Sequence, residues 1–326
     1  MTIGPGVIEP RFASAISHRL LSEPMFPPMS EGFPFQIATV AVALPSGCRP
    51  PDNALRHRIA TGFGESRSEA ATKALAEGAE RYALQFRHDM PAWFSPLITV
   101  GGPVEDAPAH DLALGAPGAK GAVTSVGAAS GDSLESAMLR AVLEQLEHLH
   151  FERLEQGIPE LDDPEPQQLE DVKSISTWLE GQLRRLDLRL GVFAEGYAMA
   201  AARCSDLDGG RATAGSAAGC EAGQALRHAA EEAVFHWRNM VALENRGIDV
   251  RDLTGADQAH FRRYRGASRA SLWPEPVKIA QRLAVLPLPD VGALMSVLAQ
   301  QTGRRARIFD MTFPPLGVFT AKCVVG

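Results

Sequence analysis

The sequence is poor in the features that mark secreted, membrane-spanning and nucleic-acid-binding proteins. It has four cysteines, none of them in a C-x-x-C pair, so no disulfide framework is indicated and a reducing, cytoplasmic location is expected. The 39 Asp and Glu residues outnumber the 32 Lys and Arg residues, and the net charge of −7 argues against binding to nucleic acid or an anionic membrane. The most apolar stretch, 283–298, is interrupted by two prolines and an aspartate, so we expect no membrane span. The phosphate-binding pattern G-x-x-x-x-G-K-[ST] is also missing.

What is present is the composition of a folded globular protein. Hydrophobic residues make up 45% of the 326 residues and charged residues 22%, which excludes a disordered or fibrous chain. Residues 1–35 are rich in Pro and Gly without a sustained period, and we expect a loosely structured lead-in there. Residues 36–326 mix helical and strand patterns without strict alternation, which predicts a single α+β domain.

The hydrophobic periodicity also predicts individual elements of this domain. Strands are expected at 36–45 and 122–126, helices at 66–87, 133–156, 169–186 and 222–243, and the chain closes with a helix at 291–301 and strands at 305–312 and 318–325.

The most informative feature is an internal repeat in three helical segments. GESRSEAATKALAEGAER, GDSLESAMLRAVLEQLEH and GCEAGQALRHAAEEAVFH align without a gap from Gly64, Gly131 and Gly219. In each segment Ala follows the glycine after six and ten residues, and Glu follows after thirteen; the first two segments add a second Glu three residues later. The shared carboxylates are Glu77, Glu80, Glu144, Glu147 and Glu232.

These alanines and glutamates fall on a single face of each helix. Residues separated by three, four or seven positions lie on one side of an α-helix, so the small residues that allow close packing share a stripe with the carboxylates. One interpretation is that Lys73–Glu77 and Arg140–Glu144 are exposed ion pairs on solvated faces. The other is a carboxylate cluster that binds Mg²⁺, because this ion takes a few carboxylates together with substrate phosphates. Three superposable copies favour the second interpretation, a Mg²⁺–nucleotide site without a P-loop.

The same segments resemble the motifs of the YcaO family. The first family motif, S-x-x-x-E-x-x-E-R-Y after a Gly-rich turn, is similar to GFGESRSEAATKALAEGAERY, with Lys73 in place of Ser. The second motif resembles TSVGAASGDSLESAMLRAVLEQLEH, in which His148 replaces Arg. In the third motif, E-x-x-Q-x-R, Phe235 replaces Gln, Trp237 replaces Arg and Arg238 follows directly. The closing segment FDMTFPPLGVFTAKCVVG also resembles the end of the family pattern.

The resemblance implies a fold, a cofactor set and a reaction. The fold is expected to be a YcaO-like α+β arrangement of related helix and strand repeats around a Mg²⁺–nucleotide site, with ATP and Mg²⁺ as cofactors. The five glutamates are implied as metal ligands, while no catalytic residue is assigned. The residues implied in nucleotide binding are Lys73, Glu77, Glu80, Arg81, Glu144, Glu147, His148, Glu232 and Arg238.

The implied activity is that of an ATP-dependent cyclodehydratase subunit in the biosynthesis of a ribosomally made peptide natural product. A Cys, Ser or Thr side chain of the precursor peptide attacks the preceding carbonyl, ATP phosphorylates the resulting oxyanion, and elimination leaves a thiazoline or oxazoline. Two alternatives remain. The substituted nucleotide motifs fit a catalytically degenerate scaffold that positions the peptide for a partner enzyme, and a different nucleophile would give a thioamide or amidine.

The resemblance also implies partner proteins. The segment before the first motif is short for a separate leader-binding domain, so a leader-peptide-binding partner is expected in addition to the precursor peptide. No flavin or dinucleotide signature is present, so a flavin dehydrogenase that oxidises azoline to azole would be a second partner. We expect a homodimer or hetero-oligomer, with neither nucleic acid nor membrane as a partner.

Overall fold

The chain divides into two compact units, and each is described by itself. The structure, a computed structural model, describes all residues except 1–8, 50–57, 118–122, 159, 254 and 267–288. Unit 1 contains Met1–Gln145 and Val291–Gly326, and unit 2 contains Leu146–Asp290. Helix α4 (Leu134–Glu155) contributes residues to both units. The single domain predicted for 36–326 would include residues of both units. That the two units form one domain stays a prediction.

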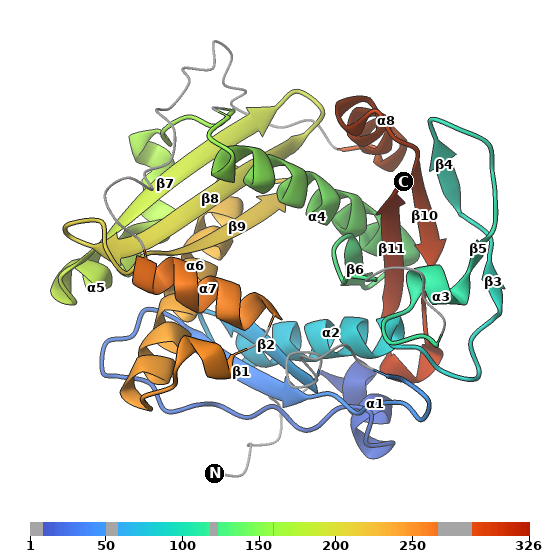
Figure 1. Ribbon diagram of the computed structural model, residues 1–326, viewed down its shortest axis with the longest axis horizontal. Helices are drawn as coiled ribbons and strands as arrows, with labels where there is room; N and C mark the ends of the chain where they lie inside the picture. Colours follow the sequence, from blue (N-terminus) through green and yellow to red (C-terminus); the bar gives the residue numbers. More distant parts are fainter. Residues whose placement is uncertain (1–8, 50–57, 118–122, 159, 254, 267–288) are drawn as a thin grey trace. The chain divides into compact units, whose positions relative to one another are not determined.

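The described part of unit 1 contains two two-stranded sheets, β1-β2 and β3-β5, and a four-stranded sheet, all antiparallel, with helices packed against them (Figure 1). The strands of the larger sheet follow the order β4-β10-β11-β6, and β1 pairs with β2. The elements are η1 (Pro10–Phe12), α1 (Ala13–Ser17), β1 (Gln36–Ala41), β2 (Ile59–Gly64), α2 (Arg67–Leu84), β3 (Trp93–Phe94), β4 (Ile98–Val100), β5 (Ala107–Pro108), α3 (Ala109–Leu112), β6 (Ala128–Gly131), the first half of α4, α8 (Val291–Thr302), β10 (Ala306–Asp310), η6 (Pro314–Leu316) and β11 (Phe319–Val325).

Unit 2 is a three-stranded antiparallel sheet, β7-β8-β9, with α6 packed along it (Figure 1). Strand β8 is buried over nearly its whole length, because its alanines lie between the neighbouring strands and the helix. The elements are the second half of α4, η3 (Pro166–Val172), α5 (Lys173–Gly181), β7 (Arg184–Phe193), β8 (Tyr197–Asp206), β9 (Thr213–Gly219), α6 (Ala222–Asn245), η4 (Val250–Asp252) and α7 (Gly255–Gly266).

The internal repeat corresponds to three strand–helix pairs. The shared glycines Gly64, Gly131 and Gly219 are the last residues of β2, β6 and β9, and each is followed after three residues by α2, α4 or α6. Gly62 and Gly215 lie so close to the backbone of the following helix that an added Cβ would come within 2.2 Å and 2.3 Å of it. The alanines on the facing stripe are buried, so small residues on both elements allow helix and strand to approach closely.

Several predicted boundaries need correction. No strand is found in the described part of 122–126; the strand nearby is β6, preceded by a turn that includes Val126 and Gly127, and the φ of Gly127 is +79°. The helix expected at 169–186 is confined to η3 and α5, because the arginine-rich segment from Arg184 onward pairs with β8. The helices expected at 66–87, 133–156 and 222–243 are confirmed as α2, α4 and α6.

The described part of the N-terminal segment, 9–35, contains two short helices that pack into the core. Phe12 and Ala15 of η1 and α1 are fully buried in the core beneath α2, and Leu21 and Met25 form isolated bridges to the β1 region. Helix α1 has five residues, too few to show a helical period in the sequence.

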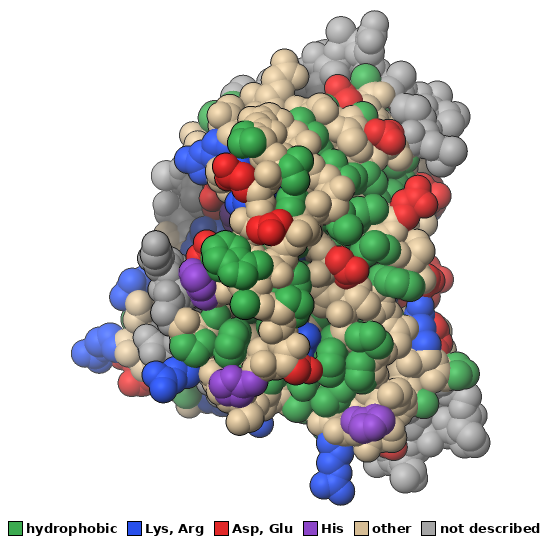
Figure 2. All heavy atoms as spheres, turned by 90° about the vertical axis from the view of Figure 1, so that its right-hand side faces the viewer, with side chains coloured by type: hydrophobic (Ala, Val, Ile, Leu, Met, Phe, Trp, Pro, Cys, Tyr) green, Lys and Arg blue, Asp and Glu red, His purple; other side chains and the backbone are tan. Residues whose placement is uncertain are grey.

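The surface of unit 1 has exposed hydrophobic side chains between isolated charges. Figure 2 shows the side on which β3, β4 and β5 lie, where hydrophobic side chains form several groups with acidic side chains between them. Trp93, Leu97 and Val104 of this segment are among the exposed large hydrophobic residues. Among the described residues, no helix has the length and apolarity that crossing a membrane requires.

Candidate functional site

In unit 1 the carboxylates of the first two repeats influence one another. Glu77 and Glu80 lie on α2, and Glu144 lies on α4. The pKa of Glu80 is well above its usual value, chiefly because of burial and then because of repulsion from Glu77 and Glu144. Repelling carboxylates of this kind are stabilised by a bound cation.

The same group of carboxylates has a buried lysine beside it. Lys322 of β11 is 4% exposed, and its Nζ donates to the carbonyl oxygens of Thr124 (2.5 Å) and Val126 (2.8 Å). Burial lowers the pKa of Lys322 to about 8, while Glu144 and Glu80 oppose that shift. Sequence reasoning missed Lys322 because it lies in an apolar strand far along the chain from both glutamates.

In unit 2 the carboxylates of the second and third repeats meet at strand β9. Glu147 accepts hydrogen bonds from the Oγ of Ser216 (2.7 Å) and the N–H of Ala218 (3.1 Å). Glu232 accepts one from the N–H of Ser216 (2.8 Å). The pKa of Glu147 is raised to about 7, first by burial and then by the charge of Glu232, while the two hydrogen bonds lower it. Here too a partly buried carboxylate lies near a second one.

A histidine absent from the sequence predictions lies beside Glu232. The Nδ1 of His236 is 2.8 Å from the carbonyl oxygen of Ala214, and its Nε2 is 3.9 Å from Oε1 of Glu232. A carbonyl oxygen only accepts, so Nδ1 carries the proton, and in the neutral ring Nε2 is the nitrogen with the lone pair. The sequence motif singled out the neighbouring Phe235 and Trp237 but not His236. The contact of His236 with Ala214 depends on the packing of α6 against β9, which the sequence alone does not reveal.

The basic residues expected at the nucleotide have identifiable protein partners. Lys73 pairs with Glu69, four residues before it on α2, at 2.7 Å. Glu77 pairs with Arg81, at 2.7 Å from its Nε.

The remaining two predicted residues lie on α4 and α6. His148 is half exposed on α4, with Nε2 3.4 Å from a carboxylate oxygen of Glu152. Arg238 lies half-buried on α6. The nucleotide-binding roles of Lys73, Arg81, His148 and Arg238 stay predictions.

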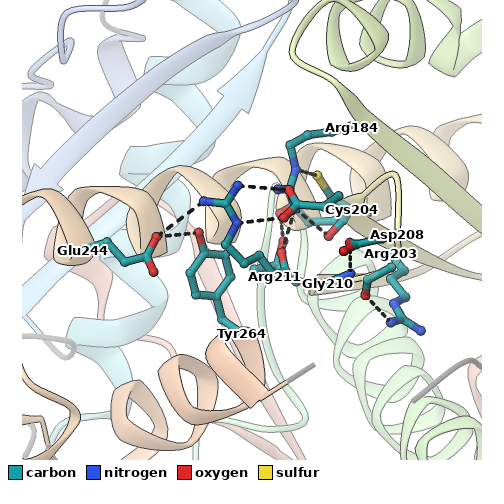
Figure 3. A network of polar contacts seen from close by, with 12 residues as sticks. Arg184, Arg203, Cys204, Asp208, Gly210, Arg211, Glu244 and Tyr264 are labelled. Carbon is teal, nitrogen blue, oxygen red and sulfur yellow. Dashed lines mark hydrogen bonds and ion pairs between the residues drawn. The ribbon is translucent and has the colours of Figure 1, made fainter. Parts of the chain in front are cut away.

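Trp237, which stands where the family motif has Arg, belongs to an aromatic and cationic cluster of unit 2. Its ring lies 5.9 Å from that of Trp178, and the guanidinium of Arg184 lies 4.5 Å above its centroid. Arg184 also donates to Asp206, to the sulfur of Cys204 and to the carbonyl of Arg211 (Figure 3). These contacts satisfy the buried positive charge of Arg184, and the ring of Trp237 provides one of them. Trp237 therefore has a packing role in addition to any role in the third motif.

The hydroxyl of Tyr264 on α7 completes the network of Figure 3 by donating to Glu244 of α6 at 2.9 Å. Burial, followed by this hydrogen bond, raises the pKa of Tyr264 to about 12. Together with the packing of Phe261, this bond fixes α7 against α6.

The donor chemistry fits magnesium bound together with phosphate. Within the described part of the chain, no three His, Cys, Asp or Glu side chains converge into a complete metal-binding group. Mg²⁺ commonly takes one or two carboxylates and completes its shell with water and substrate phosphates. Paired carboxylates whose pKa values are raised first by burial and then by mutual repulsion fit that requirement without a closed protein cage.

Comparison with known families decides the classification. The family model described as YcaO cyclodehydratase, ATP- and Mg²⁺-binding, matches residues 107–326. The chain belongs to the YcaO family. ATP and Mg²⁺, the cofactors expected from the sequence, are those of the family. The matched range includes the second and third repeat helices and the C-terminal strands; α2, which carries the first motif, precedes it.

Several solved structures share this fold. A heterocyclase in complex with substrate and cofactor superposes with a TM-score of 0.68 at 16% identity, over 97% of this chain and 52% of the other. YcaO from Methanopyrus kandleri, bound with AMPPCP and Mg²⁺, gives 0.60 at 17% identity, over 95% and 88%. The E. coli microcin synthetase McbBCD complex gives 0.62 at 10% identity, over 93% and 87%. The chain therefore spans about half the length of that heterocyclase. A search of curated proteins gave no match.

Proposed function

We propose that this YcaO protein is an ATP- and Mg²⁺-dependent cyclodehydratase subunit that forms thiazoline or oxazoline rings in a ribosomally made precursor peptide. The observation that carries the proposal is the pairing of glutamates on three repeated helices, where burial and repulsion raise the pKa values of Glu80 and Glu147. Membership of a family described as an ATP- and Mg²⁺-binding cyclodehydratase supports it.

In the proposed reaction, the chain's own residues bind and orient the nucleotide. The metal, when bound, neutralises charge on the ATP phosphates. The five glutamates would hold the ion, and Lys73, Arg81, His148 and Arg238 would contact the nucleotide. A Cys, Ser or Thr side chain of the peptide adds to the preceding carbonyl carbon, and the oxyanion takes the γ-phosphoryl group from ATP. Departure of phosphate with loss of the amide proton then gives the ring, so one ATP becomes ADP and phosphate for each ring formed.

The proposal includes the setting in which the enzyme acts. The precursor peptide is the substrate, a leader-binding protein presents it, and a flavin dehydrogenase would oxidise the azoline. None of the four cysteines, all of which the structure describes, forms a disulfide, and three of them are buried, which suits the proposed cytoplasmic location.

A second candidate is a scaffold subunit that holds the peptide for a partner enzyme. The packing of Trp237 against Trp178 and Arg184 favours it, since the partly buried side chain at this motif position contacts other protein side chains. Formation of a thioamide or amidine stays a further alternative, because the phosphorylation step would be shared and only the nucleophile would differ.

The deciding experiment is substitution of the paired carboxylates. With the leader-binding partner present, Glu80→Gln and Glu147→Gln should each abolish peptide-dependent ATP hydrolysis while the protein stays folded, because the neutral amide keeps the shape but binds Mg²⁺ poorly. Glu135→Gln is the matched control, since Glu135 is an exposed residue in the first turn of α4. Wild-type Mg²⁺–ATP affinity in both test variants, measured by calorimetry, would contradict the site assignment. A wild-type protein that binds precursor peptide but no nucleotide would support the scaffold function.

A further inference from the structure

Side chains of α4 and α6 bind the edge of β9 that faces away from β8. In the pairing of β9 with β8, Gly215 faces Ala202 and Ala217 faces Ala200. The backbone groups of the intervening residues point away from β8. Three of these groups, the carbonyl of Ala214 and the N–H groups of Ser216 and Ala218, bind His236, Glu232 and Glu147 respectively.

Ser216 connects the two carboxylates. Its N–H donates to Oε2 of Glu232 at 2.8 Å, and its Oγ donates to Oε1 of Glu147 at 2.7 Å. One residue thus holds a glutamate from the second repeat and a glutamate from the third. Because the second oxygen of Glu147 is held by the N–H of Ala218, both oxygens of that carboxylate are fixed in direction.

Hydrogen bonds of this kind determine how a carboxylate faces a ligand. Partners of ligating side chains fix their orientation, and their loss typically weakens metal affinity or activity 10–100-fold. The hydrogen bonds from Ser216 and Ala218 also stabilise the ionised form of Glu147 against its burial and against Glu232.

We infer that Ser216 is a positioning residue, whose hydroxyl and amide set the orientation of Glu147 and Glu232 for binding the Mg²⁺–nucleotide. The inference rests on the proposed function and adds a residue to that site. The peptide amide of Ser216 is retained in every substitution, so the part that mutation can test is the bond from its hydroxyl to Glu147.

If the role of Ser216 were purely structural, Ser216 would only hold β9 against α6. Thr213 provides a control for such a role. Thr213 lies on the same strand, and its Oγ1 donates to the carbonyl of Ala233 on α6 at 2.8 Å. This bond joins strand to helix without touching a carboxylate. Thr213→Val therefore removes a β9–α6 contact of similar strength and leaves both glutamates with their partners.

The test measures Mg²⁺-dependent binding of a non-hydrolysable ATP analogue by calorimetry in the full chain, over a series of Mg²⁺ concentrations. We expect Ser216→Ala to weaken the apparent Mg²⁺ affinity about 10–100-fold. Ser216→Thr, which keeps the hydroxyl, should restore affinity to near the wild-type value, and Thr213→Val should bind like the wild type. Ser216→Cys, whose thiol is a weak donor of similar size, should lie between Ala and wild type.

Two results would overturn the inference. One is wild-type affinity in both the Ala and the Cys variants, and the other is equal weakening in Thr213→Val. Because the Cys variant fills nearly the same volume as serine, it gives an answer even where the alanine variant fails to fold. Failure of the proposed function is a separate result, since a wild-type chain that binds no Mg²⁺–nucleotide refutes that function before any variant is compared.

Discussion

At the scale of single residues, the candidate site consists of carboxylates in positions that cost the apo protein stability. Glu147 lies on α4 near Glu232, and its hydrogen bonds only partly offset burial and repulsion. Natural proteins retain such groups where function requires them, because a neutral side chain of the same shape is usually easier to bury.

The pKa of Glu147 predicts how stability depends on pH. Below about pH 4.5 the side chain is protonated in both folded and unfolded chains and contributes nothing. As the pH rises toward 7, the unfolded chain loses this proton first, so the folded state binds more protons and its stability falls with rising pH. A shift from 4.5 to about 7 corresponds to a loss of roughly 3 kcal/mol, complete above pH 7.

Glu147→Gln isolates this contribution. The amide oxygen can accept from the N–H of Ala218 while its NH₂ group donates to the hydroxyl of Ser216, so the variant keeps its local contacts. Without Mg²⁺ we expect Glu147→Gln to be more stable than the wild type at pH 8 and to lose that advantage at pH 4.5. Urea unfolding at both pH values measures the difference, and a constant offset between the two proteins would refute the shifted pKa.

At the scale of elements, the repeated unit is a strand that ends in glycine followed by a helix with an alanine stripe. The close approach of α6 to β9 brings Glu232 within hydrogen-bond distance of Ser216. At Gly215 an added Cβ would lie 2.3 Å from the carbonyl oxygen of Ala229 and 2.6 Å from the nitrogen of Ala233. Both atoms belong to the helix backbone and cannot rotate away.

Gly215→Ala should therefore push α6 away from β9. We expect a loss of about 2 kcal/mol or more in the free energy of unfolding, with weaker Mg²⁺–nucleotide binding, because overpacking against backbone forces the helix to shift. Gly181→Ala is the control, since an added Cβ there meets nothing within 4 Å. Thermal unfolding compares the two, and equal stability of both variants would show that α6 can move without cost.

At the scale of the whole molecule, a peptide-modifying enzyme has to recognise a long and flexible substrate. A second contact that tethers the peptide raises its effective concentration at the reacting residues without changing the site.

We therefore expect the purified chain alone to show little peptide-dependent ATP hydrolysis. Adding a leader-binding partner should raise the rate, with loss of one water per modified residue detected by mass spectrometry of the precursor. A precursor peptide without its leader, offered to the same mixture, is the control and should react slowly. Full activity of the isolated chain on the intact precursor would disprove the need for a partner.

The sequence by itself determined the helices and the chemistry of their faces. The periodicity that predicted helices at 66–87, 133–156 and 222–243 also placed five glutamates on comparable stripes, because helical spacing is a local property of the chain. The shared glycines and the order of the motifs were enough to indicate the family. By contrast, β9 was missed, since its sequence TAGSAAG has a single β-branched residue, Thr213, and no aromatic residue by which a strand could be identified.

Only the tertiary structure decided what surrounds the glutamates. Ser216 meets Glu147 across 69 positions of sequence, and Lys322 donates to Thr124 across 198. The backbone N–H groups of β9 that hold the carboxylates exist in every sequence and carry no signature of their own. Pairing with β8 leaves these groups pointing outward, and the close packing of α6 places the carboxylate of Glu232 against them. The sequence thus named the charged groups, and the fold supplied the hydrogen bonds that orient them.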